Sequence, residues 1–223
     1  MTIATPVQLG SASAAAGSST LTLTTLADSP AGATIVVFAG DSLAVNVNSV
    51  TDSAGNTYAA GTQFFGTSGK ARPFHRLNAA HLPAGGAITV TFNTTAAAKL
   101  MGAVSVGGLA APDVEGAGAT GTGAAPSAAT GPLGWPSEIV FGLAIVAGGA
   151  GDGFTESAGF TSNTAALNGA ALRWAWRIVS TGASVTYAPT LAVSRTWATN
   201  VKSFSAIADA AFDRAGQFTY LEF

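Results

Sequence analysis

The chain has 223 residues, of which 48% are hydrophobic and 9% are charged, with a formal net charge of −2 and no cysteine. The apolar fraction is high enough for a packed core, which excludes a disordered polymer. The lack of cysteine excludes a disulfide framework and a thiolate metal site. The basic residues are scattered singly, whereas nucleic-acid binding needs clustered Lys and Arg. We therefore expect no nucleic-acid partner.

The low charge also predicts an unusual surface. An average soluble domain carries about 25% charged residues, so much of this surface must be Thr, Ser, Asn, Gly and Ala. Burying a hydroxyl costs less than burying a charge, and such a surface favours a subunit of an assembly or an extracellular protein. Residues 1–6 lack the basic and apolar regions of a secretory signal, and the longest apolar run, 139–149, is too short to span a bilayer. We expect neither a conventional leader nor a membrane partner.

Short alternating segments, separated by turn residues, run along the chain. Residues 20–24 read Thr-Leu-Thr-Leu-Thr, and 34–39 form a continuous apolar run that predicts a strand covered on both faces. Residues 41–50 alternate again, which predicts three inward side chains, Leu43, Val45 and Val47. A tight turn is expected at 52–58, where Gly55 and Asn56 tolerate positive φ. This pattern is typical of a β-sandwich or barrel.

The strand pattern occurs twice, in residues 34–110 and 138–207. Each half has an apolar strand, a Gly-rich excursion, a strand with aromatic residues and arginines, an alternating strand and a closing strand. Residues 112–134 between them are almost wholly Ala, Gly, Thr, Ser and Pro, which is compatible with a flexible linker or an extended crossover. Each half has too few strong strands to bury two faces alone. We therefore predict one antiparallel β-sandwich, jelly-roll or Ig-like, over 21–207 with its crossover at 112–134.

The two ends of the chain differ from this pattern. Residues 1–20 are small and polar, and they predict an N-terminal arm or a first strand. Residues 208–223 form a C-terminal tail in which only 209–216 could make a short helix. The tail is unexpectedly aromatic, and terminal residues fray unless they are held by a contact. We expect the arm and the tail to make inter-subunit contacts, with the apolar tail residues Phe218, Tyr220, Leu221 and Phe223.

No motif for chemistry is present on this framework. His75 and His81 have no third His or Cys partner, so a structural or surface role is expected rather than a metal site. Asp52 and Asn56 predict an Asx-type turn, because the regular acidic positions of a calcium loop are missing. Asp152 lies in a Gly-rich loop that fails the dinucleotide fingerprint. We predict no enzymatic activity, no metal and no cofactor, and a hydrolase alternative would need a carboxylate such as Asp152.

The tryptophans divide into core and surface candidates. Trp174 and Trp176 share a strand face with Leu172 and Ile178, which is the spacing of a core. Trp135, between Gly134 and Pro136, is the tryptophan that we expect to be exposed. A glycan or receptor contact would then consist of one tryptophan and three phenylalanines: Trp135, Phe64, Phe65 and Phe154.

Three segments, residues 50–58, 80–92 and 99–108, carry a family resemblance over about half to two thirds of the chain. They resemble β-sandwich proteins among bacteriophage virion and bacterial surface proteins, in which a Gly-Asn-x-Tyr turn and a Gly-x-x-x-Val-Thr-Val strand organise an Ig-like or jelly-roll module. The motifs are structural and carry no site residues across.

The resemblance implies a structural component of a tailed phage, such as a capsid decoration protein, a head spike, or a tail or fibre part. Its location would be the virion, after assembly in the host cytoplasm. The expected partners are other virion proteins of the capsid or tail lattice and further copies of this chain in a homo-oligomer. A carbohydrate- or receptor-binding module that takes a host glycan remains the alternative.

Overall fold

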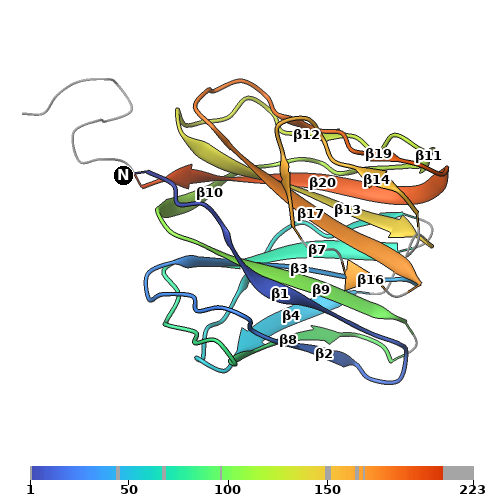
Figure 1. Cartoon of the computed structure of the whole chain (residues 1–223), viewed down its shortest axis with the longest axis horizontal. Helices are drawn as coiled ribbons and strands as arrows, with labels where there is room; N and C mark the ends of the chain where they lie inside the picture. The colour runs from blue at the N-terminus through green and yellow to red at the C-terminus, as the bar shows by residue number, and fades with distance from the viewer. Residues whose placement is uncertain are drawn as a thin grey trace, which may run out of the picture.

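The computed structural model describes residues 2–43, 46–66, 69–95, 97–148, 152–163, 166–167 and 169–207. Every regular element in these ranges is a β-strand, and the sheets are antiparallel. The sheets pack face to face in one stack (Figure 1). The predicted all-β antiparallel sandwich is therefore confirmed as the fold class, while the finer jelly-roll or Ig-like assignment stays a prediction.

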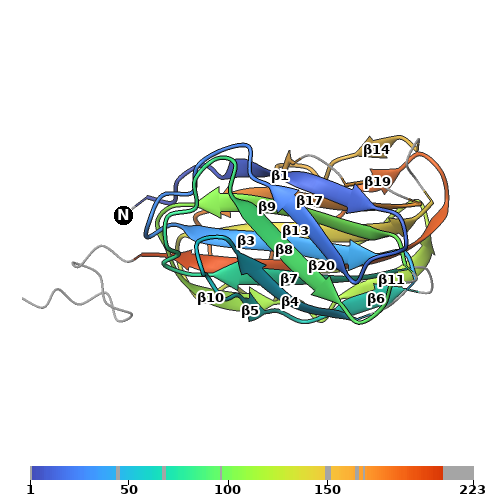
Figure 2. The same ribbon diagram turned by 90° about the horizontal axis from the view of Figure 1, so that it is seen from below.

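The first half of the chain forms a large sheet and a small sheet that covers one of its faces. The large sheet has the order β1 (Val7–Ala14), β9 (Lys99–Val106), β3 (Thr34–Asp41), β7 (Gly69–Arg76), β5 (Ala59–Ala60), and β6 (Phe64–Gly66) also pairs with β7. The small sheet has the order β2 (Thr20–Thr24), β8 (Ala87–Phe92), β4 (Val47–Asp52). Figure 2 shows this small sheet lying across β3, β7 and β9.

The second half forms another large sheet, and short strand pairs cover its outer face. The large sheet has the order β10 (Leu109–Glu115), β20 (Arg195–Ala206), β13 (Glu138–Ala147), β17 (Ala170–Val179), β15 (Thr161–Ser162). Two further strands pair with it, β11 (Ala119–Gly123) with β20 and β16 (Ala166–Leu167) with β17. The covering pairs are β12 (Ala128–Ala129) with β18 (Thr186–Tyr187) and β14 (Phe154–Thr155) with β19 (Thr190–Leu191).

The repeat seen in the sequence is thus a repeat of structure. The central strands β9-β3-β7 of the first large sheet have the same order along the chain and in space as β20-β13-β17 of the second. The edge position next to β9 is filled by β1, and the edge position next to β20 is filled by β10 and β11. The edge made by β10 is interrupted by register shifts and contains Pro112, Asp113 and Glu115.

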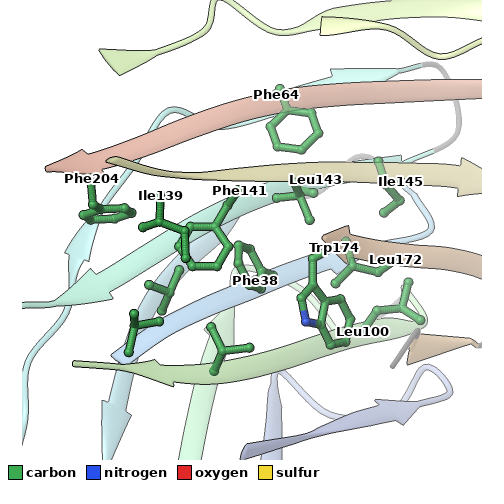
Figure 3. Close-up of a cluster of buried hydrophobic side chains, with 14 of the residues drawn as sticks. Phe38, Phe64, Leu100, Ile139, Phe141, Leu143, Ile145, Leu172, Trp174 and Phe204 are labelled. Carbon is green, nitrogen blue, oxygen red and sulfur yellow. The ribbon is translucent and has the colours of Figure 1, made fainter. Parts of the chain in front are cut away.

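The two large sheets face each other through the main hydrophobic core, to which both halves contribute. Phe38 of β3 lies at its centre, with ring centroids 5.5 Å from Phe141 of β13 and 5.8 Å from Trp174 of β17 (Figure 3). The opposite face of β3, with Ile35 and Val37, packs against the small sheet in a second core. The predicted burial of both faces of residues 34–39 is therefore confirmed, as is the core position of Trp174.

Two glycines permit the closest approaches between layers. A Cβ on Gly102 of β9 would lie 2.1 Å from the Trp174 indole, and a Cβ on Gly142 of β13 would lie 2.2 Å from the Tyr187 ring. Each glycine therefore provides the space for one fully buried aromatic ring. A core packed at this density cannot take up an additional carbon without moving neighbouring atoms.

Residues 41–50 do not form one alternating strand, so the expectation for Leu43 is wrong. Asp41 ends β3, and its Oδ1 accepts a hydrogen bond from the Leu43 backbone N–H at 2.8 Å. This contact turns the chain out of the sheet, and Leu43 is 59% exposed. The next strand, β4, begins at Val47, which is buried as expected. Val45 lies outside the described residues.

Segments with weak sequence patterns contribute edges to the sheets. Residues 1–20 were expected to form an arm or a first strand. Residues 7–14 form strand β1, which pairs with β9, so the second of these expectations holds for them. The predicted crossover at 112–134 contains the end of β10 and the strands β11 and β12, which pair with β20 and β18. The predicted helix at 209–216 and the tail residues Phe218, Tyr220, Leu221 and Phe223 lie outside the described residues.

Replacement of Gly102 by alanine tests the packing of the main core. We expect Gly102→Ala to lower the free energy of unfolding by about 1–3 kcal/mol, because the added methyl group displaces the Trp174 ring. Urea unfolding followed by circular dichroism measures the change. Gly131→Ala is the matched control, because a Cβ there meets nothing within 4 Å. Equal stability of the two variants would contradict the proposed role of Gly102.

Candidate functional site

A groove of about 420 Å³ lies at the end of the first large sheet, where β5 pairs with β7. It is lined by residues from both strands and the adjoining turns, namely Thr57, Tyr58, Ala59, His75, Arg76 and Leu77. The pairing of Ala59 with His75 places these two side chains on one face of the sheet. His75 is buried beneath the groove, whereas Ala59 and Thr57 are exposed. The groove therefore combines apolar and hydroxyl side chains with one imidazole and one guanidinium.

The turn at residues 52–58 fixes the wall of this groove. Asp52 Oδ1 accepts hydrogen bonds from the backbone N–H groups of Ala54 and Asn56, both at 3.0 Å. Its Oδ2 accepts from Asn56 Nδ2 at 2.8 Å and from the Tyr58 hydroxyl at 2.7 Å. Burial and the hydrogen bond to Asp52 raise the pKa of Tyr58. The predicted Asx-type turn is confirmed, with Gly55 at a φ of 79°, and its carboxylate already has four donors.

His75 adjoins an ion pair between a buried lysine and a half-buried glutamate of the second large sheet. Its ring lies 5.2 Å from the Phe204 ring of β20. Burial, and then the charge of Lys202, lower the pKa of His75 to about 4, so the imidazole is neutral at neutral pH. Lys202 Nζ lies 2.7 Å from Glu115 Oε2, and Glu115 Oε1 accepts from the Thr62 N–H at 2.7 Å. Glu115 therefore binds the Lys202 ammonium group of its own sheet and the Thr62 backbone N–H of the first half.

The structure separates the residues of the predicted glycan or receptor contact. Phe64 is buried in the main core, whereas Phe65 on the same short strand is 60% exposed, with Lys70 Nζ 5.5 Å from its ring centroid. Phe154 is half-buried, and the Arg173 guanidinium lies 4.3 Å from its ring centroid. Trp135 is half-buried just before β13, whereas Phe154 adjoins Val146 near the end of that strand. These side chains do not form one surface.

Asp152, the carboxylate of the hydrolase alternative, forms an ion pair. Its two oxygens accept from Arg195 Nε at 2.6 Å and Nη2 at 3.0 Å. This bidentate contact lowers the pKa of Asp152 and raises the pKa of Arg195. Such a pair is geometrically specific, because the planar guanidinium matches both carboxylate oxygens. The pair holds Asp152 against Arg195, the first residue of β20.

The carboxyl groups of Asp113 and Glu138 form a pair that the sequence analysis did not identify. Asp113 lies on β10 and Glu138 is the first residue of β13, so they are far apart in the chain. Burial, and then the nearby Asp113 carboxyl, raise the pKa of Glu138. The one signal in the sequence was an acidic residue directly before a long apolar strand. That signal does not identify Asp113 as the neighbour of Glu138, because the two residues come together only through the pairing of β10 and β13 with β20.

Among the residues that the structure describes, no group of three or more His, Cys, Asp or Glu side chains is arranged to hold a metal ion. No helix in the described ranges is long and apolar enough to cross a membrane. Comparison with known proteins found no matching family model, no matching curated protein and no matching solved structure. The resemblance to phage virion proteins therefore stays a prediction.

Replacement of His75 tests its buried, neutral state. Unfolded histidine has a pKa of 6.5, whereas folded His75 has a pKa of about 4. Between these values only the unfolded chain binds the proton, so the contribution of His75 to stability is lost as pH falls from 6.5 to about 4. We expect His75→Gln to reduce the acid sensitivity of the free energy of unfolding, by at most about 1.4 kcal/mol per pH unit.

Urea unfolding at several pH values in this window measures the difference. His81→Gln is the matched control, because His81 is exposed in the turn after β7. An unchanged pH dependence in His75→Gln would show that this side chain is not the group that binds the proton.

Proposed function

We propose that the protein is a non-enzymatic structural subunit of a bacteriophage virion, of the capsid decoration or head spike type. It binds the particle lattice and associates with further copies of itself. The observation that carries the proposal is the open edge of the first large sheet. The low charge of the chain and the placement of the two ends of its described part, residues 2 and 207, give further support.

Strand β1 forms this edge and pairs with β9 alone among the described strands. Its eight residues contain no charge and no proline. Proteins usually protect such edges with lysine, proline or a covering segment, because unpaired N–H and C=O groups pair readily with another strand. Here a bulge between Gln8 and Gly10, and a hydrogen bond from Leu26 N–H to Leu9 C=O, occupy only the first part of the strand.

Exposed apolar side chains flank the same edge. Val7 of β1 is 45% exposed, and Leu26, next to Leu9, is 77% exposed. Strand addition combines main-chain hydrogen bonds with the burial of such side chains. A second copy that pairs with β1 would extend the sheet and bury both residues. This is the mechanism by which we propose that subunits associate.

The two ends of the described chain meet at one end of the molecule, which suits attachment to a lattice. The Ala4 N–H donates to Gly107 C=O at 3.0 Å, and the Ile207 N–H donates to Gly108 C=O at 2.8 Å. Gly108 has a φ of 83°, and a Cβ there would lie 2.7 Å from Thr2 O. Figures 1 and 2 show the N-terminus beside the end of β20. Thr2 and Ile207, the two ends of the described chain, therefore both lie beside Gly108.

A lysine on the free edge tests the association. We expect Ser13→Lys to lower both the oligomeric state in solution and the copy number in purified particles, because the charge must be desolvated when a strand adds to β1. Analytical ultracentrifugation and quantitative gels of particles measure these two quantities. Thr22→Lys is the matched control, since it places the same charge on the exposed face of the small sheet.

Equal effects of the two lysines would contradict assembly through β1. Normal folding of both variants is checked by circular dichroism, so that a loss of assembly is not confused with a loss of structure.

A receptor- or glycan-binding role is a second candidate, and the exposure of Phe65 favours it. An exposed aromatic ring beside a lysine is suited to stacking on a sugar ring with a hydrogen bond from the ammonium group. We expect Phe65→Ala to abolish binding on a glycan array or to host cells. Val193→Ala removes another exposed apolar side chain and is the control. If the unmodified protein binds no glycan and no cell surface, this candidate is excluded.

A further inference from the structure

A chain of hydrogen-bonded polar side chains begins at the lysine beside the exposed Phe65 ring. Strand β6 pairs with β7 so that Phe65 is opposite Lys70, and opposite residues share a face of the sheet. Lys70 Nζ lies 5.5 Å from the centre of the ring and 3.0 Å from Asn46 Oδ1. Asn46 directly precedes β4, Gln63 directly precedes β6, and Asn93 directly follows β8. We call Asn46, Gln63, Lys70 and Asn93 the polar cluster.

Hydrogen bonds fix the orientation of the three amide side chains in this cluster. Asn93 Oδ1 accepts from the Asn46 backbone N–H at 3.1 Å. Gln63 Oε1 accepts from the Val47 backbone N–H at 3.0 Å. Asn46 Oδ1 accepts from Lys70 Nζ and from Gln63 Nε2, both at 3.0 Å. Backbone N–H and ammonium groups can only donate, so each accepting atom is the amide oxygen, and the nitrogen of each amide is identified as well.

The polar atoms that remain for a ligand are predominantly donors. The two bonds to Asn46 Oδ1 use both of its lone pairs. Lys70 Nζ and Gln63 Nε2 each use one hydrogen in these bonds and keep at least one more. Within the described part of the chain, the Nδ2 groups of Asn46 and Asn93 donate to no protein acceptor. A ligand that matches this surface presents acceptors, and anionic oxygens are the strongest acceptors for such donors.

The positive charge that faces this surface belongs to Lys70. Asp41 of β3 is opposite Lys70 on β7 and opposite Lys99 on β9, so one carboxyl has a lysine on each side. Asp41 and Lys99 are both fully buried, whereas Lys70 is half-buried. Asp41 Oδ1 accepts from the Leu43 backbone N–H. Among the residues that the structure describes, no carboxylate forms an ion pair with Lys70.

We propose that Phe65 and the polar cluster bind an anionic sugar residue, one that carries a carboxylate or a sulfate group. Phe65 is 60% exposed, and its ring stacks on the apolar face of the sugar. Lys70 and the amide NH2 groups donate to the anionic oxygens. An aromatic ring alone accepts neutral and acidic sugars alike, so the cluster supplies the selectivity. The inference rests on the second candidate function, a glycan contact at Phe65, and names the ligand of that site.

Side-chain amide signals in nitrogen–proton correlation NMR spectra test the proposal. Glucuronate and a sulfated glucose are the anionic probes, glucose is the neutral probe, and acetate is the anion without a sugar ring. We expect at least one anionic sugar to shift the NH2 signals of Asn46, Gln63 and Asn93, with an affinity about tenfold higher than that of glucose. Acetate should bind more weakly than that sugar, because it has no ring to stack on Phe65. The two anionic probes distinguish a carboxylate from a sulfate ligand.

Two variants of the polar cluster test the source of the selectivity. Lys70→Gln removes the charge and keeps a donor for Asn46 Oδ1, so the affinity for the anionic sugar should fall to that for glucose. Gln63→Glu keeps the acceptor for the Val47 N–H and adds a negative charge, so it should also abolish the preference. Neither change should alter glucose binding. Arg177→Gln is the matched control, because it removes an exposed cation from the second large sheet and should change neither affinity.

Several outcomes would overturn the inference and leave glycan binding at Phe65 intact. Equal affinities for glucose and both anionic sugars would do so, as would acetate binding as tight as that of the anionic sugars. Loss of glucose binding in Lys70→Gln would show that the lysine only supports the surface. The inference is also wrong if no probe shifts the amide signals. The candidate function itself fails only if the protein binds no glycan and no cell surface, which is a separate measurement.

Discussion

The structure depends on close packing between the two large sheets. Phe38, Phe141 and Trp174 meet between them, and the Trp174 ring fits only because Gly102 has no side chain. This interface joins the halves of the chain into one body, since each large sheet also carries its own outer layer. The Lys202–Glu115 pair and its contact with Thr62 lie at the border of the same interface. A largely desolvated ion pair of this kind adds little net stability, but loss of Glu115 would leave the buried Lys202 charge uncompensated.

Much of the fold could be predicted from the sequence because period-2 patterns report directly on burial. Residues 20–24 and 34–39 became strands with the expected faces inside. The prediction that Leu43 is buried was wrong because the Asp41 carboxylate accepts a hydrogen bond from the Leu43 backbone N–H. This local contact has no periodic signal in the sequence. Phe64 and Phe65 are neighbours on a three-residue strand, so they lie on opposite faces, and a pattern that short cannot indicate which one is buried.

The candidate site was less predictable for a different reason. Asp52 and Asn56 form a local turn, and their residue types were sufficient to predict it. The groove beside His75 and the carboxyl pair of Asp113 and Glu138 each combine residues from strands that are distant in the sequence. Their chemistry arises from strand order and register, which a single sequence does not specify. Burial also changes the charge of these groups. It lowers the pKa of His75 and raises the pKa of Glu138, and both shifts favour the neutral form.

The unequal edges of the two repeats bear on the kind of assembly that this protein can form. The position filled in the first half by β1, which has one bulge and no charge, is filled in the second half by β10 and β11. Strand β10 contains register shifts, Pro112 and two acidic residues. A subunit with two adhesive edges would add copies at both ends and grow into a fibre. In the association proposed above, pairing of β1 with β1 of another copy would use the same surface on both partners and would close after two subunits. The two halves thus share the order of their central strands but differ in the strands at their edges.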